Sequence, residues 1–289
     1  MKKSLSLLLI LALFCSLLAG CAGKQDNPPP AGETDGGAQT LSAEEPAATI
    51  RCRVISSNGS SLLVASVDSE YPDIYDLSTD GVALLMRQGD GAAVSADEAS
   101  LTAPSVGDLS EVCFSGGILE TYPARFGGVT HVTVLPDEFD DRCALYLAIL
   151  EELWGEDAGL NSAGVDCVSV DLSETSLTPA ERSAVAWTFA QSHGAEVLER
   201  SYAELVKDGY ITGTEQGGFP QWENGVLFTL AEDEDAIFNL PMTAKNAVSL
   251  DASKWRSALG AYGFTVTATQ SNDGSWSASN SDTRETWIS

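Results

Sequence analysis

The chain has 289 residues, of which 44% are hydrophobic, and 42 acidic against 15 basic side chains give it a formal net charge of −27. A nucleic-acid-binding protein must replace the counterions of phosphates with lysine and arginine, so this charge excludes nucleic acid as a partner. The same charge disfavours adhesion of the protein body to anionic lipid or to anionic wall polymer.

The N-terminus has the pattern of a secretory signal peptide. Lysines at positions 2 and 3 precede an apolar run, residues 5–18, and the small residues Ala19 and Gly20 precede Cys21. The apolar run is too short for a transmembrane helix. The tetrapeptide at 18–21, Leu-Ala-Gly-Cys, resembles the bacterial lipobox, in which the cysteine is diacylated and becomes the new N-terminus. This resemblance implies a signal peptide over residues 1–20 and a lipid anchor at Cys21, which would hold the protein on the extracellular side of the cell membrane.

Residues 21–47 form a separate region of low apolar content. They are rich in Pro, Gly, Ser, Thr and acidic residues, and such a segment cannot bury enough surface to offset the entropy of ordering. We therefore expect a disordered tether. About 240 residues remain after it, and the usual size of domains predicts two of them, over 48–137 and 138–289.

The first of these segments has the pattern of short strands and turns. Ile50, Cys52 and Val54 alternate with polar residues, and Asn58-Gly59 separates this run from the apolar run that follows. Asn-Gly between two such runs is typical of a β-hairpin, because both residues tolerate positive φ. Two further strands flank Gly116-Gly117. The segment is expected to be an all-β barrel or sandwich.

Within it, GDLSEVCFSGGILETYPARFGGVTHVTVL (107–135) resembles small secreted OB-like domains of Gram-positive bacteria. The positions that carry this resemblance are Gly107, Asp108, Gly116, Glu120, Tyr122, Pro123 and Ala124. The resemblance implies an OB-like small barrel and no particular activity. OB-like barrels bind ligands across a strand face, which makes Tyr122 and Arg125 candidate ligand-binding residues. Alternatively, Tyr122-Pro123 only shapes the corner where a strand leaves the barrel.

The second segment begins with helical patterns. DDRCALYLAILEELWG (140–155) places Tyr146, Ile149 and Leu153 on one stripe and ends at a glycine. Capping boxes at residues 178–181 and 201–204 start two more helices. Strand patterns follow at 225–232, 264–270 and 274–279. Helices followed by antiparallel strands predict an α+β domain whose helices pack on an antiparallel sheet.

KWRSALGAYGF (254–264), with the capped helices and the final WIS, resembles a functionally anonymous C-terminal domain of lipoproteins from anaerobic Gram-positive bacteria. The resemblance implies a signature of Trp255, Arg256, Gly260 and Tyr262, with Trp222 as a further candidate member. The candidate ligand-binding residues here are Trp222, Trp255, Arg256 and Tyr262, because a tryptophan beside an arginine can clamp a planar or carboxylate-bearing ligand. The alternative is a buried sheet edge with Arg256 paired to an acid.

The cysteines and histidines do not form a recognisable metal or catalytic motif. Cys15 leaves with the signal peptide and Cys21 carries lipid, so the remaining cysteines are Cys52, Cys113, Cys143 and Cys167. They show no CxxC spacing, which disfavours a zinc site. The sequence is compatible with four free thiols or with two disulfides. His131 and His193 lie beside no nucleophile motif.

The acidic run at 232–235 lacks the ladder and glycine of a calcium loop, and we interpret it as solvated. We therefore expect no metal, no cofactor and no assignable catalytic residue.

Together with these resemblances, the sequence predicts a lipid-anchored extracellular protein of a Gram-positive bacterium that acts as a non-enzymatic binding or accessory module of the cell envelope. Its expected partners are the membrane, through the N-terminal lipid, and an unknown small ligand or envelope protein. The alternative is a carboxylate-dependent hydrolase acting on envelope or extracellular carbohydrate. Such an enzyme needs a cleft with two acids about 5–9.5 Å apart, whereas a small-ligand binder needs a pocket lined by aromatic residues, which we expect near Trp255.

Overall fold

A computed structural model of the chain describes residues 47–68, 70–95, 103–161, 164–233, 246–279 and 285–289. The chain divides into the units Met1–Ala43 and Glu44–Ser289, and all described residues belong to the second unit, which is described by itself. The signal peptide, Cys21 and nearly all of the tether lie outside the described residues. In the described part, no helix combines the length and the apolar character needed to cross a membrane.

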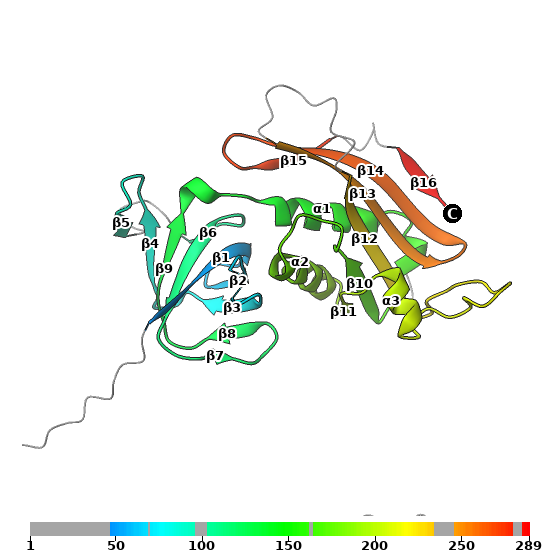
Figure 1. Cartoon of the computed structure of the whole chain (residues 1–289), viewed down its shortest axis with the longest axis horizontal. Coiled ribbons are helices and arrows are strands. Elements are labelled where there is room, and N and C mark those ends of the chain that lie inside the picture. The colour runs from blue at the N-terminus through cyan, green and yellow to red at the C-terminus, as the bar shows by residue number, and fades with distance from the viewer. Residues whose placement is uncertain (1–46, 69, 96–102, 162–163, 234–245, 280–284) are drawn as a thin grey trace, which may run out of the picture. The chain divides into compact units, whose positions relative to one another are not determined.

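Sheet A contains nine strands in the order β5-β4-β9-β6-β1-β2-β3-β8-β7 (Figure 1). They are β1 (Ala48–Ser57), β2 (Ser61–Ser66), β3 (Ile74–Ser78), β4 (Ala83–Arg87), β5 (Ala93–Ser95), β6 (Leu109–Phe114), β7 (Ile118–Leu119), β8 (Ala124–Phe126) and β9 (Val129–Leu135). The predicted β1–β2 hairpin is confirmed, with Gly59 at φ +96° and the Asn58 side chain accepting from the Ser61 backbone at 3.0 Å.

The central strands of sheet A are buried on both faces. Ile50, Cys52 and Val54 point into a core that belongs to sheet A alone. Ile55, the next residue along β1, points to the opposite face and joins the core that contains the helices, and a bulge interrupts the β1–β2 register between Val54 and Ser56. The β1–β3 region therefore supports two hydrophobic layers at once.

Sheet B contains seven strands in the order β11-β10-β12-β13-β14-β15, with β16 also paired to β14. They are β10 (Cys167–Asp171), β11 (Glu196–Leu198), β12 (Gly225–Asp233), β13 (Asn246–Ser257), β14 (Gly260–Gln270), β15 (Trp276–Ala278) and β16 (Thr286–Ile288). The sheet is a curled half-barrel of mixed direction, since β10 runs parallel to both of its neighbours while the rest are antiparallel.

The described residues form three α-helices: α1 (Arg142–Gly155), α2 (Pro179–Ser192) and α3 (Tyr202–Lys207), with short 3-10 turns η1 (Pro136–Glu138) and η2 (Ala158–Asn161). Both predicted capping boxes are confirmed at the starts of α2 and α3. Residues from α1, α2 and the inner face of sheet B share one core with Leu63, Ala65 and Ile74 of sheet A. The helices are therefore common to both sheets.

The predicted fold class is wrong. The described residues are mainly β, with 44% in strands and 19% helical, and they form neither a small OB-like barrel nor a clear helix-on-sheet α+β domain at the C-terminus. In place of the barrel, nine strands run in an open order from β5 to β7, and no pairing among the described residues joins these two ends. In place of a separate α+β domain, α2 packs against sheet A as well as β10. Hydrophobic periodicity identifies helices and strands but not the elements they pack against, and for this reason the sequence did not predict this arrangement.

A partly buried ion pair connects sheet A to helix α2 within the core that both sheets share. Arg53 of β1 lies 3.7 Å from the carboxylate of Glu181 in the first turn of α2, and both side chains are little exposed (13% and 12%). The cysteines Cys52, Cys113, Cys143 and Cys167 are all buried free thiols. Whether residues 48–137 and 138–289 fold independently stays a prediction.

Candidate functional site

Trp222, one of the predicted ligand-binding residues, lies in the interior. Its side chain is 1% exposed and packs with Leu205, Ile211 and Leu227 on the α3 face of sheet B. A Cβ on Gly225 would lie 2.1 Å from the indole Cε2, so the ring occupies the space that a side chain would otherwise take. Trp222 is thus a core residue in this structure.

Trp255 and Tyr262 lie on opposite faces of sheet B. Trp255 packs against the Trp222 cluster and meets the Tyr202 ring edge to face at 5.0 Å. Tyr262 pairs across strands with Lys254 and packs against the shared core on the other face. The structure therefore does not bring the two rings together around one ligand.

Arg256 is bonded to backbone carbonyls. It donates to Leu160 O at 2.8 Å and to Glu223 O at 2.6 Å. A Cβ on the neighbouring Gly260 would lie 2.9 Å from the Leu160 side chain. These contacts indicate that part of the KWRSALG motif fixes the segment after α1 against β13.

Tyr122 and Arg125 lie far along the chain from these residues, at the β7–β8 end of sheet A. Tyr122 is 55% exposed, and its hydroxyl donates to Glu199 Oε1 at 3.4 Å. Arg125 forms an ion pair with Asp76 at 2.9 Å. Both side chains reach solvent, and each has a structural partner.

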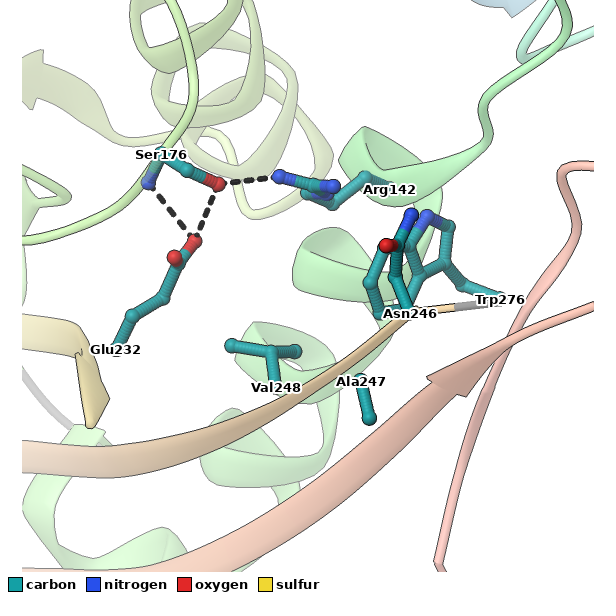
Figure 2. A pocket seen from close by; sticks show the side chains of 7 residues that line it. All are labelled: Arg142, Ser176, Glu232, Asn246, Ala247, Val248 and Trp276. Carbon is teal, nitrogen blue, oxygen red and sulfur yellow. Dashed lines mark hydrogen bonds between the residues drawn. The ribbon is translucent and has the colours of Figure 1, made fainter. Parts of the chain in front are cut away.

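A pocket of about 510 Å³ opens elsewhere, where the start of α1 meets the edge of sheet B (Figure 2). Its polar lining consists of Arg142, Ser176, Glu232 and Asn246. Its apolar lining consists of Ala247, Val248 and Trp276. This volume falls within the range of about 300–1,000 Å³ that small-molecule sites occupy.

Arg142 is the cation of this pocket. Its guanidinium carbon lies 4.6 Å from the centroid of the Trp276 ring, a cation–π contact. Nη1 donates to Ser176 Oγ, whereas Nη2 is 4.0 Å from Asp140 Oδ2, which is too long for a hydrogen bond. The Nε atom is buried and has no hydrogen-bond partner in the described part of the chain. Arg142 therefore keeps unused N–H donors.

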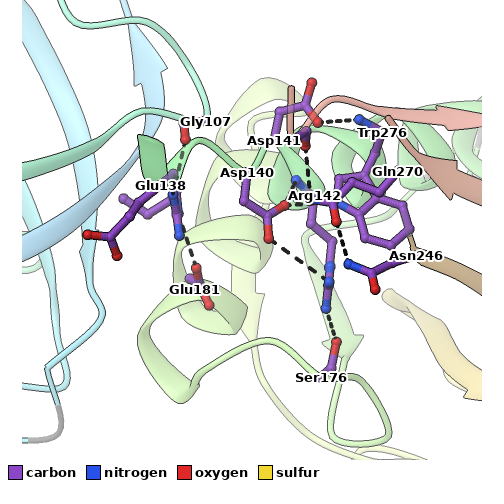
Figure 3. A network of polar contacts seen from close by, with 12 residues as sticks. Gly107, Glu138, Asp140, Asp141, Arg142, Ser176, Glu181, Asn246, Gln270 and Trp276 are labelled. Carbon is purple, nitrogen blue, oxygen red and sulfur yellow. Dashed lines mark hydrogen bonds and ion pairs between the residues drawn. The ribbon is translucent and has the colours of Figure 1, made fainter. Parts of the chain in front are cut away.

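Two aspartates hold Trp276 in place, as Figure 3 shows. Asp140 Oδ1 accepts from the indole Nε1 at 2.8 Å and from the Arg142 backbone at 3.0 Å. Asp141 Oδ1 accepts from the Trp276 backbone at 2.7 Å. Burial raises the pKa of Asp141, the hydrogen bond from Trp276 lowers it in part, and the charge of Asp140 raises it further. Ring and guanidinium are thus fixed by one short segment, residues 140–142.

Glu232, near the end of strand β12, faces Arg142 across Ser176. Its Oε1 accepts from the backbone and the hydroxyl of Ser176, both at 2.8 Å, and from the Tyr146 hydroxyl. Burial, followed by the hydrogen bond to Glu232 and its charge, raises the pKa of Tyr146, so this hydroxyl stays a donor. Within the described residues Oε2 has no hydrogen-bond partner.

Asn246, at the start of β13, is oriented by a chain of amides. Gln270 Nε2 donates to Gly274 O at 3.1 Å, which leaves Gln270 Oε1 as the acceptor for Asn246 Nδ2 at 2.6 Å. The amide orientation thus follows from the network, and Asn246 Oδ1 keeps its accepting capacity. The pocket presents a donor edge, a carboxylate oxygen and an amide oxygen.

Sequence reasoning missed this set of residues. One signal was present: an arginine in the first turn of a helix is electrostatically unfavourable, because the positive end of the helix dipole lies there, and α1 has no acid in that turn to offset it. The pairing of Trp276 with residues 140 and 141 had no local signal, since these partners are 135 or more positions apart.

Among the described residues, no side-chain cluster supports metal binding. In this part of the chain, no group of three or more His, Cys, Asp or Glu side chains is placed to hold a metal ion. His193 stacks on Trp154 at 3.7 Å and contacts Glu151 at 2.9 Å, as a residue closing α2. Comparison with protein-family models, curated proteins and solved structures finds no match to this chain.

Proposed function

We propose that the chain is a lipid-anchored extracellular binding module and that the pocket beside α1 takes a small ligand. One observation carries this proposal: Arg142 and Glu232 face one pocket, and both keep unused hydrogen-bonding capacity. A purely structural pair of this kind would be expected to satisfy each other, because unmet buried donors are costly.

The same geometry favours binding over hydrolysis. Glycoside hydrolysis by carboxylates needs a pair of acids on either side of the scissile bond. Among the described residues that line the pocket, Glu232 is the single carboxylate, and three donors hold one of its oxygens. A carboxylate fixed in this way is suited to recognition. The sequence pattern at Cys21 supports the lipid anchor and the extracellular location.

The test is thermal unfolding of the full chain in detergent against sugars, amino acids, short peptides and cations. A ligand at about 100 times its dissociation constant adds about 2.7 kcal/mol of stability, which a melting curve resolves. Stabilisation that Arg142→Gln abolishes and the exposed control Lys207→Gln retains would support the pocket. Stabilisation that survives in Arg142→Gln would place the ligand elsewhere, and a flat panel would favour an envelope protein as the partner.

A further inference from the structure

We propose that this pocket binds a small zwitterion, a free amino acid or short peptide whose carboxylate meets Arg142 and whose ammonium group meets Glu232. This inference rests on the proposed binding function and adds the chemical class of the ligand. It follows from two opposite charges that contact the same hydroxyl, Ser176 Oγ, and that are each incompletely bonded.

Arg142 presents the edge that a carboxylate recognises. A guanidinium has five N–H donors, and the described contacts use one of them, on Ser176. Trp276 covers one face of the group, so the donors remain available only along the edge. A carboxylate accepts two parallel hydrogen bonds from such an edge.

Glu232 and Asn246 provide the complementary acceptors. Ser176 and Tyr146 occupy Oε1 of Glu232 and thereby orient the carboxylate, while Oε2 is left for a ligand. Asn246 Oδ1 is a second acceptor in the lining, because its amide nitrogen is bonded to Gln270. An ammonium group has three donors and no acceptor, and it matches these oxygens.

The charge balance selects a zwitterion over a simple ion. A simple anion would satisfy Arg142 but lie near Glu232 and Asp140, in a chain whose net charge is −27. A simple cation would satisfy Glu232 but would leave the unused N–H donors of Arg142 unmatched and would lie near its positive charge. A ligand that carries both charges can pair with Arg142 and with Glu232 without changing the net charge of the site.

The rest of the lining suits an aliphatic side chain. Val248 of β13 faces the pocket and is 8% exposed, whereas the side chain of the adjacent Ala247 points to the other side of the strand (Figure 2). The volume of about 510 Å³ leaves room for more than one amino-acid residue. Leucine and leucyl-leucine are therefore suitable probes for the free amino acid and the peptide.

The experiment compares these probes with analogues that lack one charge. Calorimetric titration of the full chain in detergent would use L-leucine, L-leucyl-L-leucine, N-acetyl-L-leucine and L-leucinamide. We expect one of the two zwitterions to bind, and the analogue without the ammonium or without the carboxylate to bind at least about tenfold more weakly. The inference would be overturned if either analogue bound as tightly as the zwitterion, or if neither zwitterion bound at millimolar concentration.

Two variants assign the charges to their residues. Arg142→Gln should remove the preference for leucine over leucinamide, and Glu232→Gln should remove the preference for leucine over N-acetyl-leucine. Asn246→Ala changes an exposed side chain and keeps the test informative if either charge variant unfolds; it should weaken binding of the zwitterion. The surface control Lys207→Gln, at the exposed end of α3, should leave all four titrations unchanged.

Failure of this inference is distinguishable from failure of the proposed function. If a sugar or an uncharged amide stabilises the protein and Arg142→Gln abolishes the effect, the pocket is a binding site for another class of ligand. If none of the sugars, cations, amino acids and peptides shifts the melting curve, both the ligand class and the pocket function are wrong.

Discussion

Replacing Lys254 by methionine should destabilise the protein, because this lysine closes the C-terminal end of α1 from inside the core. Lys254 is 0% exposed on β13. Its Nζ donates to the carbonyls of Trp154, at 3.4 Å, and Asp157, at 3.2 Å, and to Asn161 Oδ1 at 2.8 Å, and it also contacts the carbonyl of Glu156. The last carbonyls of a helix have no partner within the helix, so the ammonium group serves as a cap supplied by another element.

The structure sets the size of the effect. Methionine fills a similar volume but provides no donor, so the acceptors lose their shared partner. Glu156 and Asp157 are exposed and can regain water, whereas Trp154 and Asn161 are partly buried. An unsatisfied buried polar group costs about 1–3 kcal/mol, and removal of the ammonium also removes its desolvation cost, so we expect a net loss of about 2–4 kcal/mol.

The loss should depend on pH in a defined direction. Burial lowers the pKa of Lys254 from 10.5 to about 8, partly opposed by the charges of Asp157 and Glu156. Between these two pKa values the unfolded chain binds more protons at this site than the folded one, so Lys254 makes stability rise with pH in that window and leaves it unchanged below pH 8. The variant lacks this contribution, and its deficit should widen from pH 8 to 10.

The assay is urea unfolding followed by circular dichroism at several pH values. Lys207→Met, at the exposed end of α3, is the matched control and should stay within about 0.5 kcal/mol of the parent. A Lys254→Met protein as stable as the parent, or a deficit that shrinks as the pH rises above 8, would refute this account of the lysine.

Three further changes probe the anchor, the core and the pocket. Cys21→Ala should move the protein from the membrane fraction to the soluble fraction on cell fractionation, and unchanged retention would contradict the lipobox. Gly225→Ala should cost at least about 2 kcal/mol in urea unfolding, because its Cβ would lie 2.1 Å from the Trp222 ring, and a neutral effect would show that the ring moves freely. Tyr146→Phe should cost about 1–2 kcal/mol in the same assay, since it removes a donor to Glu232, and an unchanged midpoint would show that this bond contributes nothing.

Local features of this fold were predictable, because their physics is local. Thr178 and Ser201 each bond to a glutamate three residues later, and both helix starts follow from that spacing alone. The Asn58-Gly59 turn follows from the backbone freedom of two residues. The end of α1 at Gly155 follows from a glycine after an apolar stripe.

The arrangement of these elements was not predictable, because it depends on pairing between distant segments. The alternation of CVSVD shows a strand, but nothing in it specifies that β10 runs parallel to both β11 and β12. Strand alternation places Ile55 on the face opposite Val54, and α2 covers that face, so one strand contributes to two cores. A prediction that assigned each strand to one domain could not anticipate a shared interior.

The pocket lies where local and tertiary preferences conflict, and that conflict is informative. Asp141 occupies the N-cap position of α1, yet its side chain makes no capping bond and accepts from the Trp276 backbone instead. Arg142 follows at the first helical position, where the helix dipole favours an acid. An N-cap bond contributes about 1 kcal/mol, and a cation in the first turn forgoes further stabilisation. Two adjacent departures from helix rules that converge on one aromatic ring are expected where a site is built at the expense of local stability, which is the physical reason to test Arg142 first.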